Sequence, residues 1–169
     1  MNLYQRLGYL VLGSRLRRLS ENFLSEINKV YQDEGIDFDA NWFPVFYLLS
    51  KNGSLSIKEL SEQTEVSHPA ASQLITNLKN KNLVTSIACS EDGRRQLVQL
   101  MPEGKALLQQ ILPIWDAILL AMNELESEDA ANAEFLTSIG ALENAFKNLN
   151  LAKRINLKLR NTLTETSNG

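Results

Sequence analysis

Apolar residues recur every three or four positions from Leu3 to Tyr31, and this spacing predicts one long amphipathic helix. Gly35 is expected to end that segment. The pattern then restarts, and a second helix is predicted from Asp39, as its N-cap, to Ser50. Asn52 and Gly53 follow as a turn signal, so the next element begins at about residue 54.

Two short helices are predicted in the middle of the chain, each with a recognisable start. Ser56 and Glu59 have the spacing of a capping box, which begins a helix of about residues 56–63. Ser67 is the N-cap of the next helix, which runs to about Lys81 with Pro69 in its first turn. Asn82 stands where a residue of positive φ is expected to end that helix.

Residues 83–88 and 96–101 are β-capable runs, and Ser90-Glu91-Asp92-Gly93 between them is typical of a hairpin tip. Residues 54–104 therefore contain a helix, a tight turn, a second helix and a β-hairpin, in that order. This order predicts a winged helix-turn-helix.

The rest of the chain is predicted to be helical. One long apolar helix follows residue 104 and carries Pro113 inside it, where a kink is expected, and another covers about residues 129–149. A tail at 151–169 is first basic and then polar; a solvated extension of the helix is favoured over contact with DNA, and its polar end is expected to be mobile. The basic residues of the tail are Lys153, Arg154, Lys158 and Arg160.

The fold class expected is mainly α with a small β-hairpin wing: a winged helix-turn-helix at 54–104 flanked by dimerisation helices at 1–34 and 105–150. A chain of 169 residues fits one such domain over residues 1–150. The apolar stripes at both ends are too large for the small winged unit to cover, which favours a homodimer. A compact monomeric bundle is the alternative.

The second helix of the winged unit presents short, uncharged, hydrogen-bonding side chains opposite its apolar face. Such groups can contact base edges in the major groove, although an ordinary solvated helix face has the same composition. The candidate DNA contacts at and after the helix start are Ser67, His68, Ser72, Gln73, Thr76 and Asn77. Arg94 and Arg95 would contribute from the wing, and Lys58, Lys79 and Lys81 would be available to phosphates. Local pairing of Asp92 with Arg94 is an alternative role for that arginine.

The chain resembles the MarR family of transcriptional regulators. The resemblance rests on SIKELSEQTEVSHPAASQLITNLKNKNLV and on EDGRRQLVQLMPEGKALL, in which Asp92 and Arg94 match the family's wing carboxylate and arginine. It implies a homodimer that binds double-stranded DNA at a pseudo-palindromic operator, often as a repressor. The sequence departs from the family's pattern at Asn82, Gly93 and Met101.

The family resemblance also implies that a small aromatic or anionic effector, held beside the dimer helices, releases the protein from DNA. Trp42, Phe43, Phe46 and Tyr47 cluster in the sequence near that junction and are the candidate pocket residues. Four aromatic residues at this spacing are also typical of a hydrophobic core.

Charge and reactive residues narrow the function further. The net charge is −3, and acidic residues outnumber basic ones within 54–104, so DNA affinity must come from a few well-placed contacts. This acidity also keeps two alternatives open: a winged-helix module that docks a protein, and a ligand-binding dimer without DNA binding.

One cysteine, Cys89, and one histidine, His68, offer neither a metal site nor a catalytic pair, so we expect no cofactor and no enzyme. Without an apolar leader or an uninterrupted apolar span, we expect a soluble cytoplasmic protein with no membrane partner.

Overall fold

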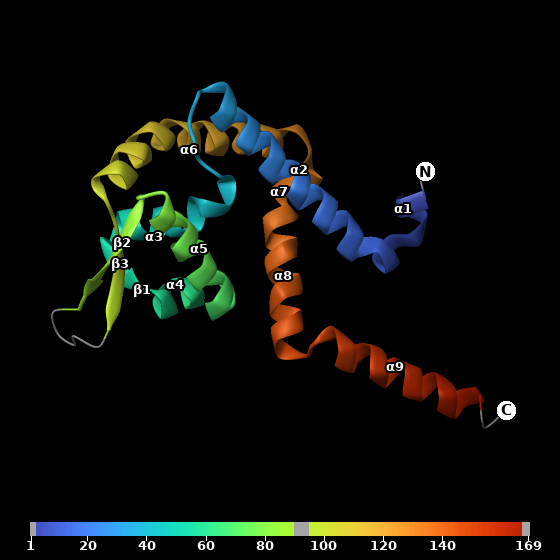
Figure 1. Ribbon diagram of the computed structural model, residues 1–169. Helices are drawn as coiled ribbons and strands as arrows, with labels where there is room; N and C mark the ends of the chain where they lie inside the picture. Colours follow the sequence, from blue (N-terminus) through green and yellow to red (C-terminus); the bar gives the residue numbers. More distant parts are fainter. Residues whose placement is uncertain (1–2, 90–94, 167–169) are drawn as a thin grey trace. The chain divides into compact units, whose positions relative to one another are not determined.

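The computed structural model describes residues 3–89 and 95–166 (Figure 1). The chain falls into two compact units, residues 1–115 and 116–169. The first contains a three-stranded antiparallel sheet with helices packed on it, and the second is helical. The expected class, mainly α with a small winged-helix sheet, is confirmed.

The N-terminal helix is interrupted. It consists of α1 (Leu3–Leu7), a 3-10 turn η1 (Gly8–Val11) and α2 (Leu12–Asp33). The prediction of one continuous helix over 3–31 is wrong, because Gly8 has a φ of +53°. Glycine adopts this left-handed conformation without steric cost, and an α-helix cannot pass through it.

The next segment begins with the predicted cap. The Asp39 side chain accepts a hydrogen bond from the backbone N–H of Asn41, 2.8 Å away, and starts the 3-10 turn η2 (Ala40–Trp42). Helix α3 (Phe43–Asn52) follows directly, with Pro44 in its first turn. Since no intrahelical bond is available to the first amides of a helix, Pro44 interrupts nothing there.

An aromatic cluster forms the core between α2 and α3. The ring of Phe38 meets Tyr31, Trp42 and Phe46 edge to face, with centroids 4.9, 5.5 and 5.1 Å apart. All four side chains are buried. Edge-to-face packing of this kind adds to the stabilisation by apolar burial and holds α3 against α2.

Helices α4 (Ile57–Gln63) and α5 (His68–Asn80) form the helix-turn-helix, and their predicted caps are present. Both reciprocal bonds of the capping box between Ser56 and Glu59 are formed. Beyond α5, Asn82 has a φ of +57°, as predicted. These local signals fix where both helices begin and where the second one stops.

The sheet has the strand order β1-β3-β2, all antiparallel. Strands β2 (Val84–Ala88) and β3 (Gln96–Leu100) are the predicted hairpin, paired from Val84 opposite Leu100 to Ala88 opposite Gln96. The predicted tip lies within residues 90–94, outside the described residues. Strand β1 (Ser54–Ser56), which pairs with β3, is an element that the sequence analysis missed.

Helix α6 (Pro102–Glu128) follows β3, and its first turn makes a close contact with the sheet at Gly104. A side chain at this position would collide with the backbone carbonyl of Leu83 and crowd Leu100. Only glycine lets the first turn of α6 approach the strand so closely. Residues 36–104, from the start of the α3 segment to this contact, are called the winged module below.

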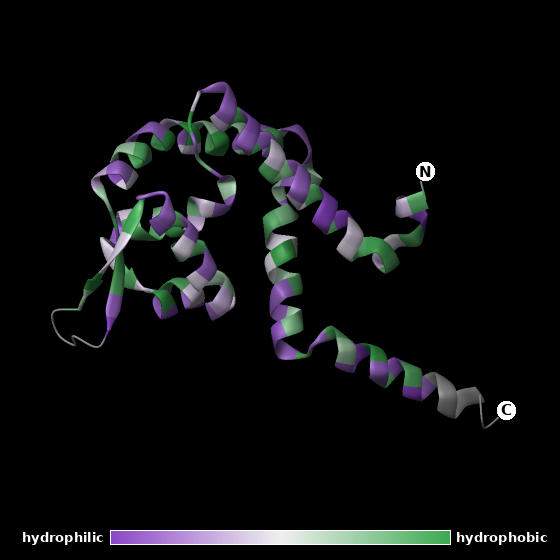
Figure 2. Cartoon of the chain, viewed as in Figure 1, coloured by the Kyte–Doolittle hydropathy of each residue, from purple (hydrophilic) through white to green (hydrophobic). Residues whose placement is uncertain are grey.

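The second unit contains the end of α6, then α7 (Ala130–Ala133), α8 (Phe135–Asn148) and α9 (Leu151–Thr166). Asp129 caps α7, and a break at Glu134 divides the helix predicted over 129–149. From Asp116 to Asn161 no described side chain is buried. Figure 2 shows hydrophobic and hydrophilic residues alternating along α8 and along the coloured part of α9.

Helix α6 is long and apolar enough to cross a membrane, judged by length and composition alone. Its most apolar 18 residues have a mean hydropathy of 1.3, and 17% of that stretch is buried in the structure. A helix that packs against another protein surface meets the same criterion, so the feature indicates a large apolar face in need of a partner.

Candidate nucleic-acid interface

Helix α5 is fixed in the winged module by its apolar face. Ala71, Ile75 and Leu78 are 3%, 1% and 0% exposed, and the Ser67 hydroxyl accepts a hydrogen bond from the backbone N–H of Ala70 at the helix start. Since these contacts set the rotation of the helix about its axis, they also determine which side chains face solvent.

The outward face of α5 carries the polar residues expected from the sequence. Gln73, Thr76 and Asn77 are exposed, and Ser72 is half-buried. Gln73 Nε2 donates to Asn77 Oδ1 at 3.0 Å, and Thr76 Oγ1 donates to the Ser72 carbonyl at 2.9 Å. These bonds order the face while leaving Gln73 Oε1 as an acceptor, Asn77 Nδ2 as a donor and the Thr76 hydroxyl as an acceptor. Such groups can contact base edges.

Helix α4, which precedes α5, is tied to the base of the wing. The Glu59 carboxylate accepts bonds from the Ser56 amide at 2.8 Å and the Ser56 hydroxyl at 2.6 Å, and Arg95 Nη2 lies 3.3 Å from its other oxygen. The hydrogen bonds from Ser56, with a smaller contribution from the Arg95 charge, lower the pKa of Glu59. One carboxylate thus caps α4 and holds the side chain of a wing arginine.

The candidate cations of the module differ in their surroundings. Lys79 is exposed in the last turn of α5, and Lys58 lies 3.8 Å from Glu62 on α4. Arg95 is paired with Glu59 as above, while Arg94, the other wing arginine, lies outside the described residues, as does Asp92. His68 is exposed in the first turn of α5. These placements put four candidate residues on or beside the helix-turn-helix.

Two ion pairs across the module could not be found in the sequence. Lys81 Nζ lies 2.8 Å from Asp37 and 5.4 Å from the centre of the Trp42 ring, and the Arg95–Glu59 pair joins the wing to α4. The two residues of the first pair are 44 positions apart in the chain, and those of the second pair are 36 positions apart. No periodicity or short motif connects positions at such separations.

The four aromatic residues suggested as an effector pocket divide into two pairs. Trp42 and Phe46 belong to the core, whereas Phe43 and Tyr47 are 40% and 44% exposed. The two exposed rings stack with centroids 5.7 Å apart, and Phe43 meets Trp115 edge to face at 4.7 Å. The pair therefore forms the accessible part of an aromatic surface.

Polar groups flank this aromatic surface. The ammonium of Lys51 lies 5.6 Å from the centre of the Tyr47 ring. On the buried side, Trp115 Nε1 donates to the Tyr31 hydroxyl at 3.1 Å. Burial raises the pKa of Tyr31 above its usual range, so the hydroxyl stays protonated near neutral pH. The surface thus combines stacked rings with one cation at its edge.

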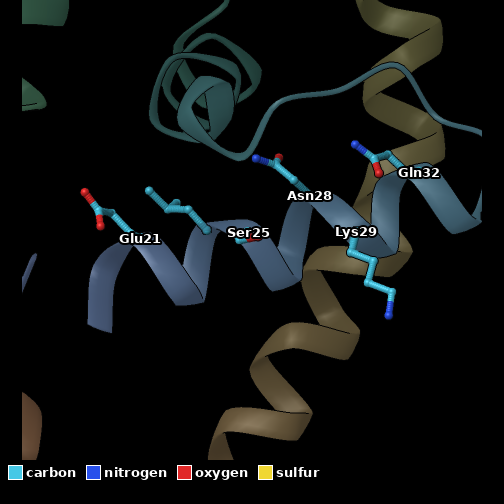
Figure 3. A pocket seen from close by; sticks show the side chains of 6 residues that line it. Glu21, Ser25, Asn28, Lys29 and Gln32 are labelled. Atoms are coloured by element: carbon cyan, nitrogen blue, oxygen red, sulfur yellow. The ribbon is translucent and has the colours of Figure 1, made fainter. Parts of the chain in front are cut away.

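A separate hollow of about 610 Å³ lies along one face of α2. Figure 3 shows Glu21, Ser25, Asn28, Lys29 and Gln32 along this face, and Leu24 completes the lining. Asn28 is already engaged, since its Oδ1 accepts the backbone N–H of Ala40 at 2.7 Å. The hollow is open and includes none of the four candidate aromatic residues. Within residues 3–89 and 95–166, no cluster of three or more His, Cys, Asp or Glu side chains could hold a metal ion.

The winged module is similar to known proteins both in sequence and in fold. The model of the MarR family matches residues 36–95. Over 73 residues, 43% of this chain, the sequence is 32% identical to the HTH-type transcriptional regulator FarR of Neisseria gonorrhoeae. The matched region spans 49% of FarR, about half its length.

Solved structures extend the likeness to most of the chain. The regulator MOSR of M. tuberculosis, solved in complex with DNA, superposes with a TM-score of 0.66 and 18% identity over 83% of this chain and 98% of MOSR. BpsR of Bordetella bronchiseptica, whose DNA binding is regulated by 6-hydroxynicotinic acid, superposes with a TM-score of 0.50 and 23% identity, covering 92% of this chain and 98% of BpsR. At these identities the superpositions establish the fold.

Proposed function

We propose that this chain, whose residues 36–95 belong to the MarR family, is a sequence-specific DNA-binding regulator of transcription. The observation that carries the proposal is the outward face of α5. Gln73, Thr76 and Asn77 are exposed on a helix whose opposite face is fully packed. A rigidly held helix with amide and hydroxyl groups on its outer face suits the major groove.

Phosphate contacts supplement this face. Lys58, Lys79 and Arg95 are exposed cations on the helix-turn-helix and at the base of the wing, and Arg94 is expected to join them. The pairs of Lys58 with Glu62 and of Arg95 with Glu59 are solvent-exposed and contribute little to stability, so a phosphate can replace the carboxylate. The chain acts as a binding protein and not as an enzyme.

The active form is a homodimer. Large apolar side chains on α6 and α8 are exposed in the single chain, including Leu119 at 63%, Leu120 at 70% and Leu136 at 68%. A second copy would cover them symmetrically and present two winged modules to a pseudo-palindromic operator. Binding of such a dimer in the cytoplasm over a promoter would repress transcription.

Selection of binding sites from random duplexes tests the proposal. The wild-type protein is expected to enrich one symmetric sequence. Gln73→Ala should lose about 1–3 kcal/mol of binding free energy and relax the preference at one base pair of each half-site. Gln109→Ala, an exposed glutamine on α6, serves as the matched control and should bind as the wild type does. Enrichment of no sequence by the wild-type protein would contradict the proposal.

The aromatic surface supports a second role, release by an effector. Stacked Phe43 and Tyr47 with Lys51 at the edge suit a small aromatic carboxylate, which would stack on the rings and pair with the ammonium. An effector regulates only by binding one arrangement of the two modules more tightly than the other. Hydroxylated aromatic acids such as 6-hydroxynicotinic acid should raise the Tm of the wild-type protein and not that of Tyr47→Ala.

A further inference from the structure

The start of β3 lies beside the start of α4 because the sheet joins the two segments. Ser56, the last residue of β1, pairs with Leu97 of β3, and α4 begins directly after it. On the other side of β3, the backbone carbonyl of Arg95 accepts the N–H of Cys89 at 2.9 Å. The sheet therefore fixes the backbone positions from which the side chains of Glu59 and Arg95 meet.

The two ends of this ion pair are held with different strength. The Glu59 carboxylate accepts two hydrogen bonds from Ser56, one from the amide at 2.8 Å and one from the hydroxyl at 2.6 Å. Arg95 reaches it through a single nitrogen, Nη2, at 3.3 Å, and the arginine side chain is 51% exposed. An exposed arginine can exchange partners at little cost, whereas a carboxylate in a capping box moves only if the helix loses its cap.

The second ion pair on α4 provides a contrast. Lys58 Nζ lies 3.8 Å from the Glu62 carboxylate, and the two side chains are 78% and 64% exposed. Pairs of this kind on a helix surface are weak, and their side chains separate easily. Glu59, by comparison, is 39% exposed and lies closer to its cation. Its charge therefore acts more strongly on the cation beside it than that of Glu62 does.

We propose that Glu59 is a positioning residue that limits the affinity of the winged module for DNA, because its fixed carboxylate holds Arg95 and repels a phosphate that approaches the same guanidinium. The inference rests on the proposed DNA-binding function and adds to it a residue that sets the strength of binding. When Arg95 turns to a phosphate, Glu59 stays behind at the cap, and two negative charges then share one cation. Phosphate contacts carry no sequence information, so the limit applies to every duplex alike.

Such a limit suits a protein that must find one site among many. Non-specific duplex is present in large excess and is bound through phosphates alone. Weaker phosphate contact keeps the protein from being held on such duplex, while an operator still offers base contacts to Gln73 and Asn77 on α5. The acidity of the winged module is then part of its function.

Glu59→Gln separates the two roles of this side chain. Glutamine also serves in a capping box, so the cap is kept while the negative charge is removed. Affinity for the selected operator and for a random-sequence duplex should rise together, by roughly two- to fivefold at low ionic strength. The slope of log K against log salt should steepen by up to about 0.9, because Arg95 gains a phosphate partner. Fluorescence anisotropy measures both quantities, and urea unfolding verifies that the variant is folded.

A double-mutant cycle with Arg95→Ala shows whether Glu59 acts through this arginine. In the Arg95→Ala background, Glu59→Gln should change DNA affinity no more than Glu26→Gln does. Glu26 is exposed on α2, so its replacement removes the same charge away from the pair. An undiminished effect of Glu59→Gln without Arg95 would assign it to general charge and overturn the inference.

The direction of the change is equally decisive. Lower affinity of Glu59→Gln would show that the carboxylate orients Arg95 for DNA contact, and unchanged affinity with an unchanged salt slope would show that the pair has no bearing on DNA. Either result contradicts the inference and leaves the proposed function standing. A wild-type protein that binds no duplex at any salt concentration would instead contradict the proposed function itself.

Discussion

The winged module and the C-terminal unit both consist largely of leucine-rich amphipathic helices, yet they differ in where the apolar side chains lie. In the module, Ile75, Leu78 and Val98 are at most 1% exposed. In the C-terminal unit no described side chain from Asp116 to Asn161 is buried. The module therefore completes a core within one chain, whereas the C-terminal unit offers apolar faces that another chain must cover.

The two parts also differ in the role of their polar and charged residues: those of the module concern DNA binding, and those of the C-terminal unit concern association between chains. The module's polar groups are bonded to one another, as in the Ser56–Glu59 box, or aimed outward on α5. The C-terminal unit carries charge in two opposed blocks. Substitutions in the module should act on stability and on DNA binding, and substitutions in the C-terminal unit should act on association.

The largest effect is expected from charges placed on the apolar face of α6. Leu119→Glu combined with Leu120→Glu should not lower the stability of the monomer, in which both side chains face water. In a dimer that buries them, each leucine contributes about 1.5–3 kcal/mol to the free energy of association. Light scattering after size exclusion should show monomers with unchanged helical content. A variant that stays dimeric would show that the dimer interface lies elsewhere, and the contrast drawn between the winged module and the C-terminal unit would be wrong.

A smaller but local loss of stability is expected at the junction of β2 and α6. Gly104→Ala forces a methyl group against the Leu83 carbonyl, and overpacking of this kind typically lowers the free energy of unfolding by about 1–3 kcal/mol. Gly13→Ala, in α2 where a Cβ meets nothing, is the matched control and should gain about 0.4–1 kcal/mol. Urea unfolding measures both. Equal effects at the two positions would show that the close approach at Gly104 is unimportant.

The capping box should produce a modest, pH-dependent effect. Ser56→Ala should cost about 0.5–2 kcal/mol near neutral pH. Because the folded pKa of Glu59 is lowered, its contribution is complete above the unfolded carboxyl pKa and is lost as the pH falls through the folded value. The difference between variant and wild type should therefore shrink in acid. A difference that is constant with pH would mean that Glu59 takes no part in the cap.

Local signals in the sequence predicted much of the winged module. The cap at Ser67, the capping box at Ser56 and the positive φ of Asn82 depend on a few neighbouring residues, and each was confirmed. The outward face of α5 followed from helical periodicity once the helix was placed. The sequence also identified these polar residues as candidates for DNA contact, a role that remains a prediction.

Features that depend on distant parts of the chain were missed. Strand β1 is too short to show alternation and exists because β3 pairs with it. The pairs of Lys81 with Asp37 and Arg95 with Glu59 join separate elements. The break at Gly8 was missed because glycine can also lie within an α-helix, and only its positive φ in the fold shows that the α-helix is interrupted there.

Titration of the protein against duplex DNA from upstream of its own gene, at several salt concentrations, tests the central claim most directly. A DNA-binding dimer should lose affinity steeply with salt, with a slope of log K against log salt of about −0.9 for each phosphate contacted, and Arg94→Ala should make the slope shallower. A winged module that docks proteins, the alternative favoured by its acidity, should show no salt-dependent affinity for any duplex, and that result would contradict the account.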